Sequence, residues 1–462
     1  MQERQDTDHR IVAFRHPLIQ EVAYGAQLKA RRSALHAVVA KAVEGFYATR
    51  LDEFAGLLAY HFEAAGDELS AASYAARAAK WVGTTNSRQA IKYWHQVRSL
   101  MIAQPRSPDN DALRIMASGQ IAMFGWREGM TKDEAKPFLQ EALAWAREVD
   151  DEMVQLLLAT DGRLSVDAEV YIERVQEALS LAEKTRNIGR IATLNAFLCH
   201  AYTNAGLVKE ALEASIASLA DASEIGAKDQ SFLGFDVETW VRYLRTRSLV
   251  RLGHFVEGEE CAAITLEKAR KMTDPIIQVS PHFAYLELAW YRRDSVLADR
   301  HATCFSGIAQ ASGLSYLKIY SLCCRGIAQL ITESFREAAE NFSEAITIAR
   351  KASTAMELEP ELLTNLSEAH YHLGETGFAL NFAREAMNLA RWRGARLAEC
   401  RAAIIAAWAT IAEAGTTCDA EAQMLFDRAE ELFKVCGAGI HVVAFESGRI
   451  LPEMATVPEV EA

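Results

Sequence analysis

The stretch AYTNAGLVKEAL, from Ala201 to Leu212, indicates most plainly how the chain folds. Its first half ends at Gly206, and Ala211 follows five positions later in a second stretch of helix-favouring composition. Glycine adopts the left-handed backbone conformation of a helix end at low steric cost, and a small residue shortly afterwards lets a second helix approach closely. This stretch therefore predicts the turn of a helical hairpin.

The same spacing, a turn residue followed five positions later by a mostly small residue, recurs along the chain. The copies are Gly66 with Ala71, Thr85 with Ala90, Gly253 with Gly258, Asp294 with Asp299, Glu333 with Ala338, Gly374 with Ala379, and Gly415 with Ala420. From Gly206 onward the turn positions are 47, 41, 39, 41 and 41 residues apart. A nearly constant step of about 40 residues indicates a stack of helix pairs.

Apolar residues within these segments follow the helical period. The segment from Phe335 to Ala349 places its apolar residues at spacings of three and four, which gives one buried face. A single helix pair cannot bury such a face, but a stack of pairs can. The sequence thus predicts an all-α, tetratricopeptide-like α-solenoid, a right-handed superhelix of helix hairpins.

Composition excludes several classes of protein. The chain has 462 residues, 50% of them hydrophobic and only 9 of them proline, which favours long helices over disorder. A formal net charge of −13 opposes binding to nucleic acid. The eight cysteines form no C-x-x-C pair, and no apolar run suits a signal or a membrane span. We therefore expect a cytoplasmic protein with neither a nucleic-acid nor a membrane partner.

The segment FRHPLIQEVAYGAQLKARRSALHAVVAKAVE, from Phe14 to Glu44, resembles a stretch of large bacterial signalling ATPases, many of which carry a class III adenylate or guanylate cyclase domain. The matching positions are Phe14, Arg15, His16, Leu18, Gln20, Glu21, Val22, Ala23, Tyr24, Arg31, Arg32, Leu35 and His36. In that family the stretch closes the helical domain after the ATPase module, and tetratricopeptide repeats follow it. The resemblance is tight over 13–101 and looser afterwards, and a more distant one links the chain to transcriptional regulators with a similar repeat arm.

This resemblance implies a sensing or scaffolding arm in a signal-transduction system, with an ATPase or cyclase module as a possible partner. The sequence has no G-x-x-x-x-G-K-[ST] loop for a nucleotide and no paired-aspartate metal site in a strand context. We therefore expect no enzyme activity, no catalytic or metal-binding residues and no cofactor. Two alternatives stay open: a truncated or split cyclase-related protein whose catalytic modules lie on another chain, and the small-molecule-sensing arm of a transcriptional regulator.

Composition shifts and the resemblance together predict the organisation of the chain. The expected parts are a disordered tail at 1–12, a remnant of the helical domain that follows the ATPase module at 13–51, first helical repeats at 52–103, the main array at 112–436, and a cap with a frayed tail at 437–462. The polar segments 104–111 and 221–230 are candidate hinges. We also expect Ile11, Phe14 and Ile19 to be poorly covered.

In tetratricopeptide arrays the first helix of each pair lines the concave surface, so aromatic, charged and histidine residues on these helices are candidate contacts for a protein or peptide ligand. These candidates are Trp240, Tyr243, Arg247, His200, Glu368 and Tyr371. The alternative is that each of them packs between successive helix pairs.

Overall fold

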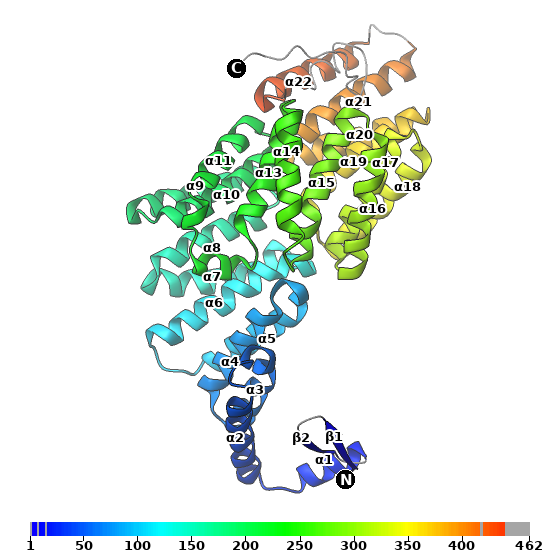
Figure 1. The fold of residues 1–462 in the computed structure, drawn as a ribbon. Coiled ribbons are helices and arrows are strands. Elements are labelled where there is room, and N and C mark those ends of the chain that lie inside the picture. The colour runs from blue at the N-terminus through cyan, green and yellow to red at the C-terminus, as the bar shows by residue number, and fades with distance from the viewer. Residues whose placement is uncertain (1, 7–8, 14–15, 416–418, 439–462) are drawn as a thin grey trace. The chain divides into compact units, whose positions relative to one another are not determined.

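The computed structural model describes residues 2–6, 9–13, 16–415 and 419–438. Two compact units are present: 1–82 with 89–117, and 83–88 with 118–462. Helix α6 (Pro108–Gly125) passes from the first unit into the second (Figure 1). The division between the units therefore lies within a helix, after the polar segment 104–111 that the sequence suggested as a hinge.

The first unit begins with a pair of strands. β1 (Gln2–Asp6) pairs antiparallel with β2 (His9–Ala13), where the sequence led us to expect a disordered tail at 1–12. Ile11 and Val12 are β-branched residues that favour an extended backbone. The helices that follow are α1 (Pro17–Gly25), α2 (Lys29–Phe46), α3 (Leu51–Ala65), α4 (Glu68–Val82) and α5 (Ser87–Met101).

The hairpin of α3 and α4 has the predicted turn. Gly66 ends α3 with a φ of +84°, and Ala71 on α4 is fully buried. Ile19 on α1 is 57% exposed, as expected for a poorly covered residue. Phe14 lies outside the described residues, and the environment of the Ile11 side chain stays a prediction.

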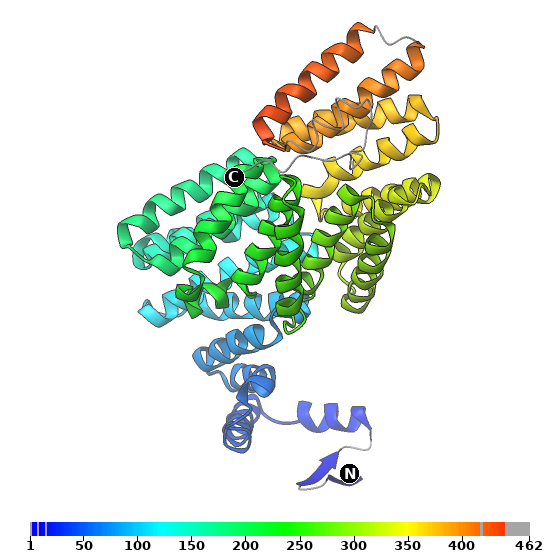
Figure 2. The ribbon, with the colours of Figure 1, turned by 45° about the horizontal axis from the view of Figure 1, so that its top comes forward.

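The second unit is a stack of helix pairs (Figures 1 and 2). After η1 (Gly83–Asn86), α6 and η2 (Trp126–Glu128), its elements are α7 (Lys132–Val149), α8 (Asp151–Leu164), α9 (Ala168–Thr185), α10 (Ile188–Ala205), α11 (Val208–Ala220), η3 (Ala222–Glu224), α12 (Ala227–Leu233), α13 (Val237–Arg251), α14 (Phe255–Ala269), α15 (Pro275–Arg292), α16 (Ser295–Ser312), α17 (Ser315–Ile331), α18 (Phe335–Ala352), η4 (Met356–Leu358), α19 (Glu359–His372), α20 (Thr376–Arg393), α21 (Arg396–Ala414) and α22 (Ala420–Cys436).

The predicted turn residues take the left-handed conformation at five of the six positions from Gly206 onward. The exception is Asp294, because the left-handed residue is Arg293 and Asp294 caps α16 instead. Accordingly Ala298 is fully buried, whereas Asp299 is exposed. With this correction the left-handed residues are 47, 40, 40, 41 and 41 residues apart, which is more regular than the sequence template suggested.

The last pair departs from the template in a different way. Gly415 ends α21 with a φ of +66°, but α22 starts only after Asp419, whose side chain caps it. Ala420 is therefore an exposed first residue of the helix, and Ala422 is the small buried one. Residues 416–418, and most of the predicted cap and tail at 437–462, lie outside the described residues.

The first helix of each pair lies inside the array and the second lies outside it. Helix α15 is buried on nearly all sides, whereas α18 buries a single face that includes Phe342 and Ile346. Consecutive first helices, such as α13, α15, α17, α19 and α21, pack against one another. The inner helices therefore supply much of the core and some of the side chains that line the interior.

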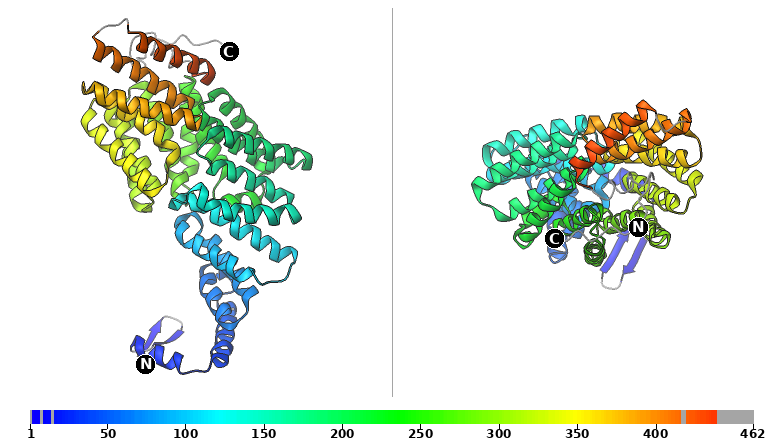
Figure 3. Two further views of the ribbon diagram at one scale, coloured as in Figure 1. Left: turned by 180° about the vertical axis from the view of Figure 1, so that it is seen from behind. Right: turned by 90° about the horizontal axis from the view of Figure 1, so that it is seen from above.

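The second unit closes on itself, so that its early helices meet its late ones. The Thr354 hydroxyl donates a hydrogen bond to the Trp126 carbonyl at 3.2 Å. Arg396 forms an ion pair with Glu169, and a Cβ added at Gly206 would lie 2.7 Å from the Leu397 nitrogen. The views from behind and above show α8 to α11 beside α20 to α22 (Figure 3).

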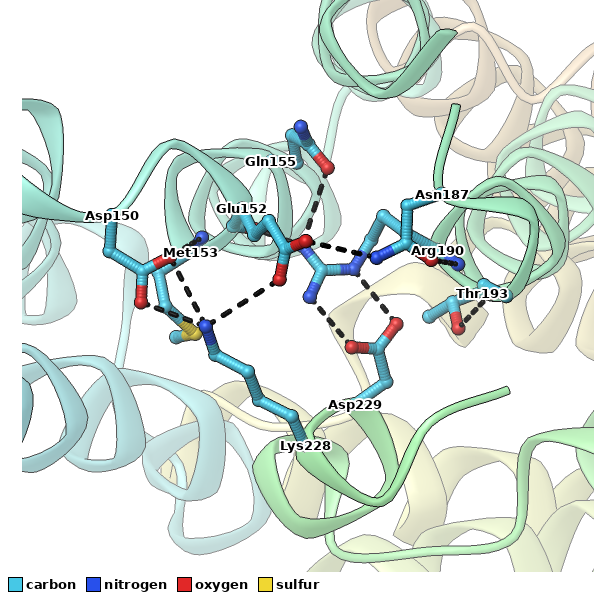
Figure 4. Close-up of polar contacts among 10 residues, drawn as sticks. Asp150, Glu152, Met153, Gln155, Asn187, Arg190, Thr193, Lys228 and Asp229 are labelled. Atoms are coloured by element: carbon cyan, nitrogen blue, oxygen red, sulfur yellow. Dashed lines mark hydrogen bonds and ion pairs between the residues drawn. The ribbon is translucent and has the colours of Figure 1, made fainter. Parts of the chain in front are cut away.

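A buried charge network fixes the segment 221–230, which the sequence suggested as a hinge. Arg190, which is 1% exposed, donates to both carboxylate oxygens of Asp229 on α12, at 2.8 and 2.6 Å (Figure 4). Arg190 also donates to the Glu152 carbonyl on α8, and a Cβ at Gly189 would clash with the Glu224 carbonyl oxygen. The segment is packed against α8 and α10, which argues against a hinge.

In the part of the chain that the structure describes, no helix combines the length and apolar character needed to cross a membrane.

Candidate ligand cavity of the second unit

Two adjoining hollows open inside the second unit. The larger, of about 450 Å³, is here named the aromatic hollow. It is bordered by Trp126, Arg163, Tyr171, His200, Tyr316 and Met356. The smaller, of about 100 Å³, is named the polar hollow. It is bordered by Arg247, Arg251, Glu287, Trp290, Asn365 and Arg401. Asn204, Glu357 and Ala395 border both, so the two hollows adjoin and are together called the cavity.

The wall of the aromatic hollow comes from both ends of the closed array. Trp126 follows α6 and His200 lies on α10, whereas Tyr316 begins α17 and Met356 lies in η4. The ring centroids of Trp126 and Tyr316 are 5.0 Å apart with their planes nearly perpendicular. The hollow thus exists because the array closes, and a ligand bound there would contact early and late repeats together.

Arg163, at the end of α8, is the distinctive side chain of the aromatic hollow. Its Cζ lies 4.2 Å from the Trp126 ring centroid and 5.7 Å from that of Trp240. Its Nε and Nη1 are shielded from solvent and have no hydrogen-bond partner among the described residues. Burial lowers the pKa of Arg163, which reflects the cost of holding this cation away from water.

The other arginines of this hollow are already paired. Arg350 and Arg393 both donate to Glu359, each at 2.7 Å. Glu357, an exposed residue, accepts hydrogen bonds from the Tyr316 and Tyr320 hydroxyls at 3.1 and 3.0 Å. Arg163 is therefore the cavity arginine without an anionic partner among the described residues.

Charge pairing dominates the polar hollow. The Glu287 carboxylate accepts from Arg247 at 2.6 and 3.1 Å and from Arg251 at 3.0 and 2.6 Å. Burial raises the pKa of Glu287, but the charges of Arg247 and Arg251 outweigh this effect and lower the pKa to about 2. The three side chains are nearly buried, so this triad is a rigid wall of the cavity.

A second pairing lies beside the triad. Arg401 donates to Glu368 at 3.1 Å and to the Asn365 side chain at 2.9 Å, and its Cζ lies 4.7 Å from the Trp290 ring centroid. Glu368 Oε1 and Asn365 Nδ2 have no hydrogen-bond partner in the described part of the chain. Asn365 borders the polar hollow together with Glu287, so the hollow is lined by both hydrogen-bond donors and acceptors.

His200 faces the aromatic hollow as a neutral side chain. Its Nδ1 lies 3.2 Å from the Tyr171 hydroxyl. Burial, with the charges of Arg163 and Arg247, holds the pKa of His200 well below its usual value.

The six candidates from the sequence divide into two groups. Arg247 and His200 line the cavity, and their contact with a ligand stays a prediction. Trp240, Tyr243, Glu368 and Tyr371 do not border either hollow. Trp240 is 6% exposed and packs against Phe197 and His200 between helix pairs, because a flat ring fills the gap between successive first helices.

Tyr243, Glu368 and Tyr371 support the cavity or lie away from it. Tyr243 receives a hydrogen bond from Arg247 at 3.2 Å, and Glu368 holds Arg401. Tyr371 is half-buried, and its ring lies edge-on to His372. Sequence analysis missed Arg163, Trp126, Tyr316 and Glu357, which lie at helix ends and in turns.

The residues that carry the family resemblance lie in the first unit. The Tyr24 hydroxyl is 2.9 Å from Nε2 of buried His36, whose Nδ1 is 2.8 Å from Nδ1 of His61. Arg32 lies over the Tyr24 ring at 5.0 Å, and His16 caps α1. Gln20, Glu21 and Arg31 are exposed, and Phe14 and Arg15 lie outside the described residues.

Within residues 16–415 and the other described segments, no group of three or more His, Cys, Asp or Glu side chains is placed to hold a metal ion.

A second histidine pair, between α15 and α16, should make the protein sensitive to acid. His282 and His301 are buried with their Nδ1 atoms 2.9 Å apart. Burial, aided by Arg270, lowers the pKa of His282 to about 4, and burial with the His282 charge does the same for His301. Below pH 6.5 the unfolded chain binds protons that the folded one excludes, so the free energy of unfolding should fall as the pH drops to about 4.

The expected loss is on the order of 3 kcal/mol for the pair. Urea unfolding at several pH values between 6.5 and 4 measures it. The double variant His282→Gln, His301→Gln should show a shallower pH dependence, while the exposed control His254→Gln should match the wild type. Equal slopes in all three proteins would contradict this account.

Comparison with known proteins establishes the fold and not the activity. No known family model matches the chain, and no curated protein matches it in sequence. A Rap protein complexed with Competence and Sporulation Factor is similar in structure, with a TM-score of 0.60, 11% identity, and coverage of 80% of this chain and 98% of that one. This likeness confirms the tetratricopeptide-like α-solenoid predicted from the sequence.

Two further solved structures are more distant. A STAND signal-transduction ATPase with a tetratricopeptide repeat sensor from Pyrococcus horikoshii has a TM-score of 0.43 and 14% identity, covering 76% of this chain and 52% of that one. The apo form of RapI has a TM-score of 0.40 and 13% identity, covering 72% and 90%.

Proposed function

We propose that the chain is a non-catalytic recognition module that binds a peptide segment of another protein in the cavity of its second unit. The observation that carries this proposal is the cavity itself, which joins an aromatic wall, paired charges and unpaired polar groups inside the closed array. Binding sites commonly combine apolar surface with a few polar groups that fix orientation. The Rap protein of similar fold was solved with a bound factor, which supports a ligand-binding role.

We further propose that this module works in a signalling system. The resemblance over 13–101 favours a cytoplasmic signalling system of the ATPase or adenylate/guanylate cyclase type, in which this chain is the sensing or scaffolding arm. The catalytic modules would then lie elsewhere, including on another chain. A bound ligand would act by favouring one arrangement of the early and late repeats over another.

The test is selection of linear peptides from a random library on the purified chain, followed by calorimetric titration of the selected peptides. Val166 borders the aromatic hollow and is 37% exposed, so Val166→Trp should fill the hollow without removing a core contact. Val256, 69% exposed on the outer helix α14, provides the matched control Val256→Trp. We expect peptides that bind the wild type and Val256→Trp, with at least tenfold weaker binding to Val166→Trp, which corresponds to about 1.4 kcal/mol.

Peptides that bind all three proteins equally would place the interaction outside the cavity and overturn the proposal. A small-molecule ligand is the second candidate, because about 450 Å³ suits a small organic molecule as well. In that case no peptide would be selected, and members of a metabolite library would raise the melting temperature of the wild type and Val256→Trp but not of Val166→Trp.

A further inference from the structure

The aromatic hollow contains a cation, Arg163, that forms no ion pair with any residue the structure describes. Arg163 has five N–H donors, and its Nε and Nη1 lack a hydrogen-bond partner among the described residues. Leaving such donors unpaired and shielded is costly, more so when the group is charged. The faces of Trp126 and Trp240 hold the guanidinium by cation–π contact, which offsets part of that cost but leaves the N–H groups unused.

The charges around Arg163 indicate what kind of ligand group could pair with it. Glu357 lies close enough to influence Arg163 electrostatically but forms no ion pair with it, and it is already held by Tyr316 and Tyr320. Arg127, whose positive charge also acts on Arg163, is neutralised by Asp274 through hydrogen bonds of 3.0 and 2.8 Å. One positive charge on Arg163 is therefore available to the cavity, with a carboxylate of opposite sign beside it.

We propose that Arg163 is the anchor for a carboxylate of the bound peptide, either its C-terminus or an Asp or Glu side chain. This inference rests on the peptide-binding function proposed above and names the chemistry of its ligand. A singly charged carboxylate matches one guanidinium, whereas a doubly charged phosphate would leave a negative charge beside Glu357. Glu357, at the junction with the polar hollow, is placed to accept an N–H group of the same peptide.

Defined probes test this anchor without knowledge of the natural ligand. The probe is N-acetylglycine, which carries one carboxylate, and its neutral counterpart is N-acetylglycine methylamide. The readout is the indole N–H signal of Trp126 in the nitrogen–proton correlation spectrum of the full chain, because Arg163 stacks on that ring. Three proteins are compared: wild type, Arg163→Met, and Arg384→Gln, which removes an exposed arginine of α20 that pairs with Glu421.

N-acetylglycine should shift the Trp126 signal saturably in the wild type and in Arg384→Gln, with at least tenfold weaker binding to Arg163→Met. The methylamide should bind at least tenfold more weakly than the acid. Without probe, Arg163→Met should unfold at the same temperature as the wild type or higher, because a charged group with two shielded, unpaired nitrogens has been removed.

Any of the following outcomes would contradict the proposal that Arg163 binds a carboxylate. They are no shift with N-acetylglycine, an equal shift with the methylamide, tighter binding of inorganic phosphate than of the acid, and a melting temperature of Arg163→Met well below that of the wild type. Peptides selected as described above distinguish this failure from failure of peptide binding itself. If they bind in the cavity but keep their affinity for Arg163→Met, the proposed function stands and the carboxylate anchor does not. Amidating their C-termini separates a terminal carboxylate from a side-chain one.

Discussion

Replacing Glu287 by alanine should lower the free energy of unfolding by about 3–5 kcal/mol, because it leaves two nearly buried arginines facing each other without an anion. Urea unfolding followed by circular dichroism measures the change. Glu344→Ala is the control, since Glu344 and its partner Lys318 are both about half exposed. A surface pair of this kind contributes about 0–1 kcal/mol. If both variants lose the same small amount, the triad does not stabilise the array.

The same carboxylate gives a pH signature. Its pKa in the folded chain, about 2, is below the ordinary value of 4.5, so its contribution to stability is present above pH 4.5 and is lost as the pH falls towards 2. Glu287→Ala should therefore lose less stability than the wild type over that interval. An unchanged acid dependence would show that Glu287 is not held in its ionised form by Arg247 and Arg251.

The second large effect concerns Asp229→Ala, for which we expect a loss of about 3–5 kcal/mol in the free energy of unfolding. The substitution leaves the charged Arg190, which is 1% exposed, without its carboxylate partner. It also releases α12 from α10, so hydrogen exchange in α12 should accelerate before the rest of the array is affected. The adjacent Lys228→Ala is the matched control, because its ion pairs with Asp150 and Glu152 are partly exposed.

The double variant Arg190→Met, Asp229→Ala completes the test. Removing both charges should recover part of the lost stability, since an apolar side chain in that space no longer needs a partner. If the double variant loses more free energy of unfolding than the two single variants lose together, the pair does not act as a unit. It would also reopen the possibility that 221–230 bends.

The helical pairs were predictable because turn geometry and close packing impose local residue types. Gly206, Gly253 and Gly374 mark helix ends by their own chemistry, so their positions could be found without knowledge of the fold. Arg293 could not be found in this way, because an arginine in the left-handed conformation carries no local signal and the adjacent Asp294 looks more like a turn residue. The one-residue error in that repeat follows from this.

Some residues in or next to the cavity could also have been predicted from the sequence. His200, Arg247, Glu287 and Glu368 each lie six residues before a left-handed residue, so they occupy equivalent positions on successive first helices. The 40-residue separation of Arg247 and Glu287 equals the repeat step and would have predicted their pairing. Trp240 was misplaced because a helix that is buried on several sides gives no periodicity from which to choose the face that meets the cavity.

The aromatic hollow could not be predicted from the sequence, for a different reason. Trp126 and Thr354 are 228 residues apart, and Glu169 and Arg396 are 227 apart. No repeat spacing relates such positions, since their proximity depends on small rotations added over many helix pairs. Arg163 and Glu357 lie in or next to these closing segments, so no sequence pattern indicates that they share a cavity.

The contact between early and late repeats also bears on how the chain acquires its structure. A solenoid normally has low contact order and grows by adding each repeat to the one before it. Here the segment around Trp126 leaves the ribosome more than 200 residues before its partner Thr354 is synthesised. Loop-closure entropy opposes bringing such distant segments together before the intervening repeats are folded. The contact between early and late repeats should therefore form last, and the cavity exists only once the whole array has been made.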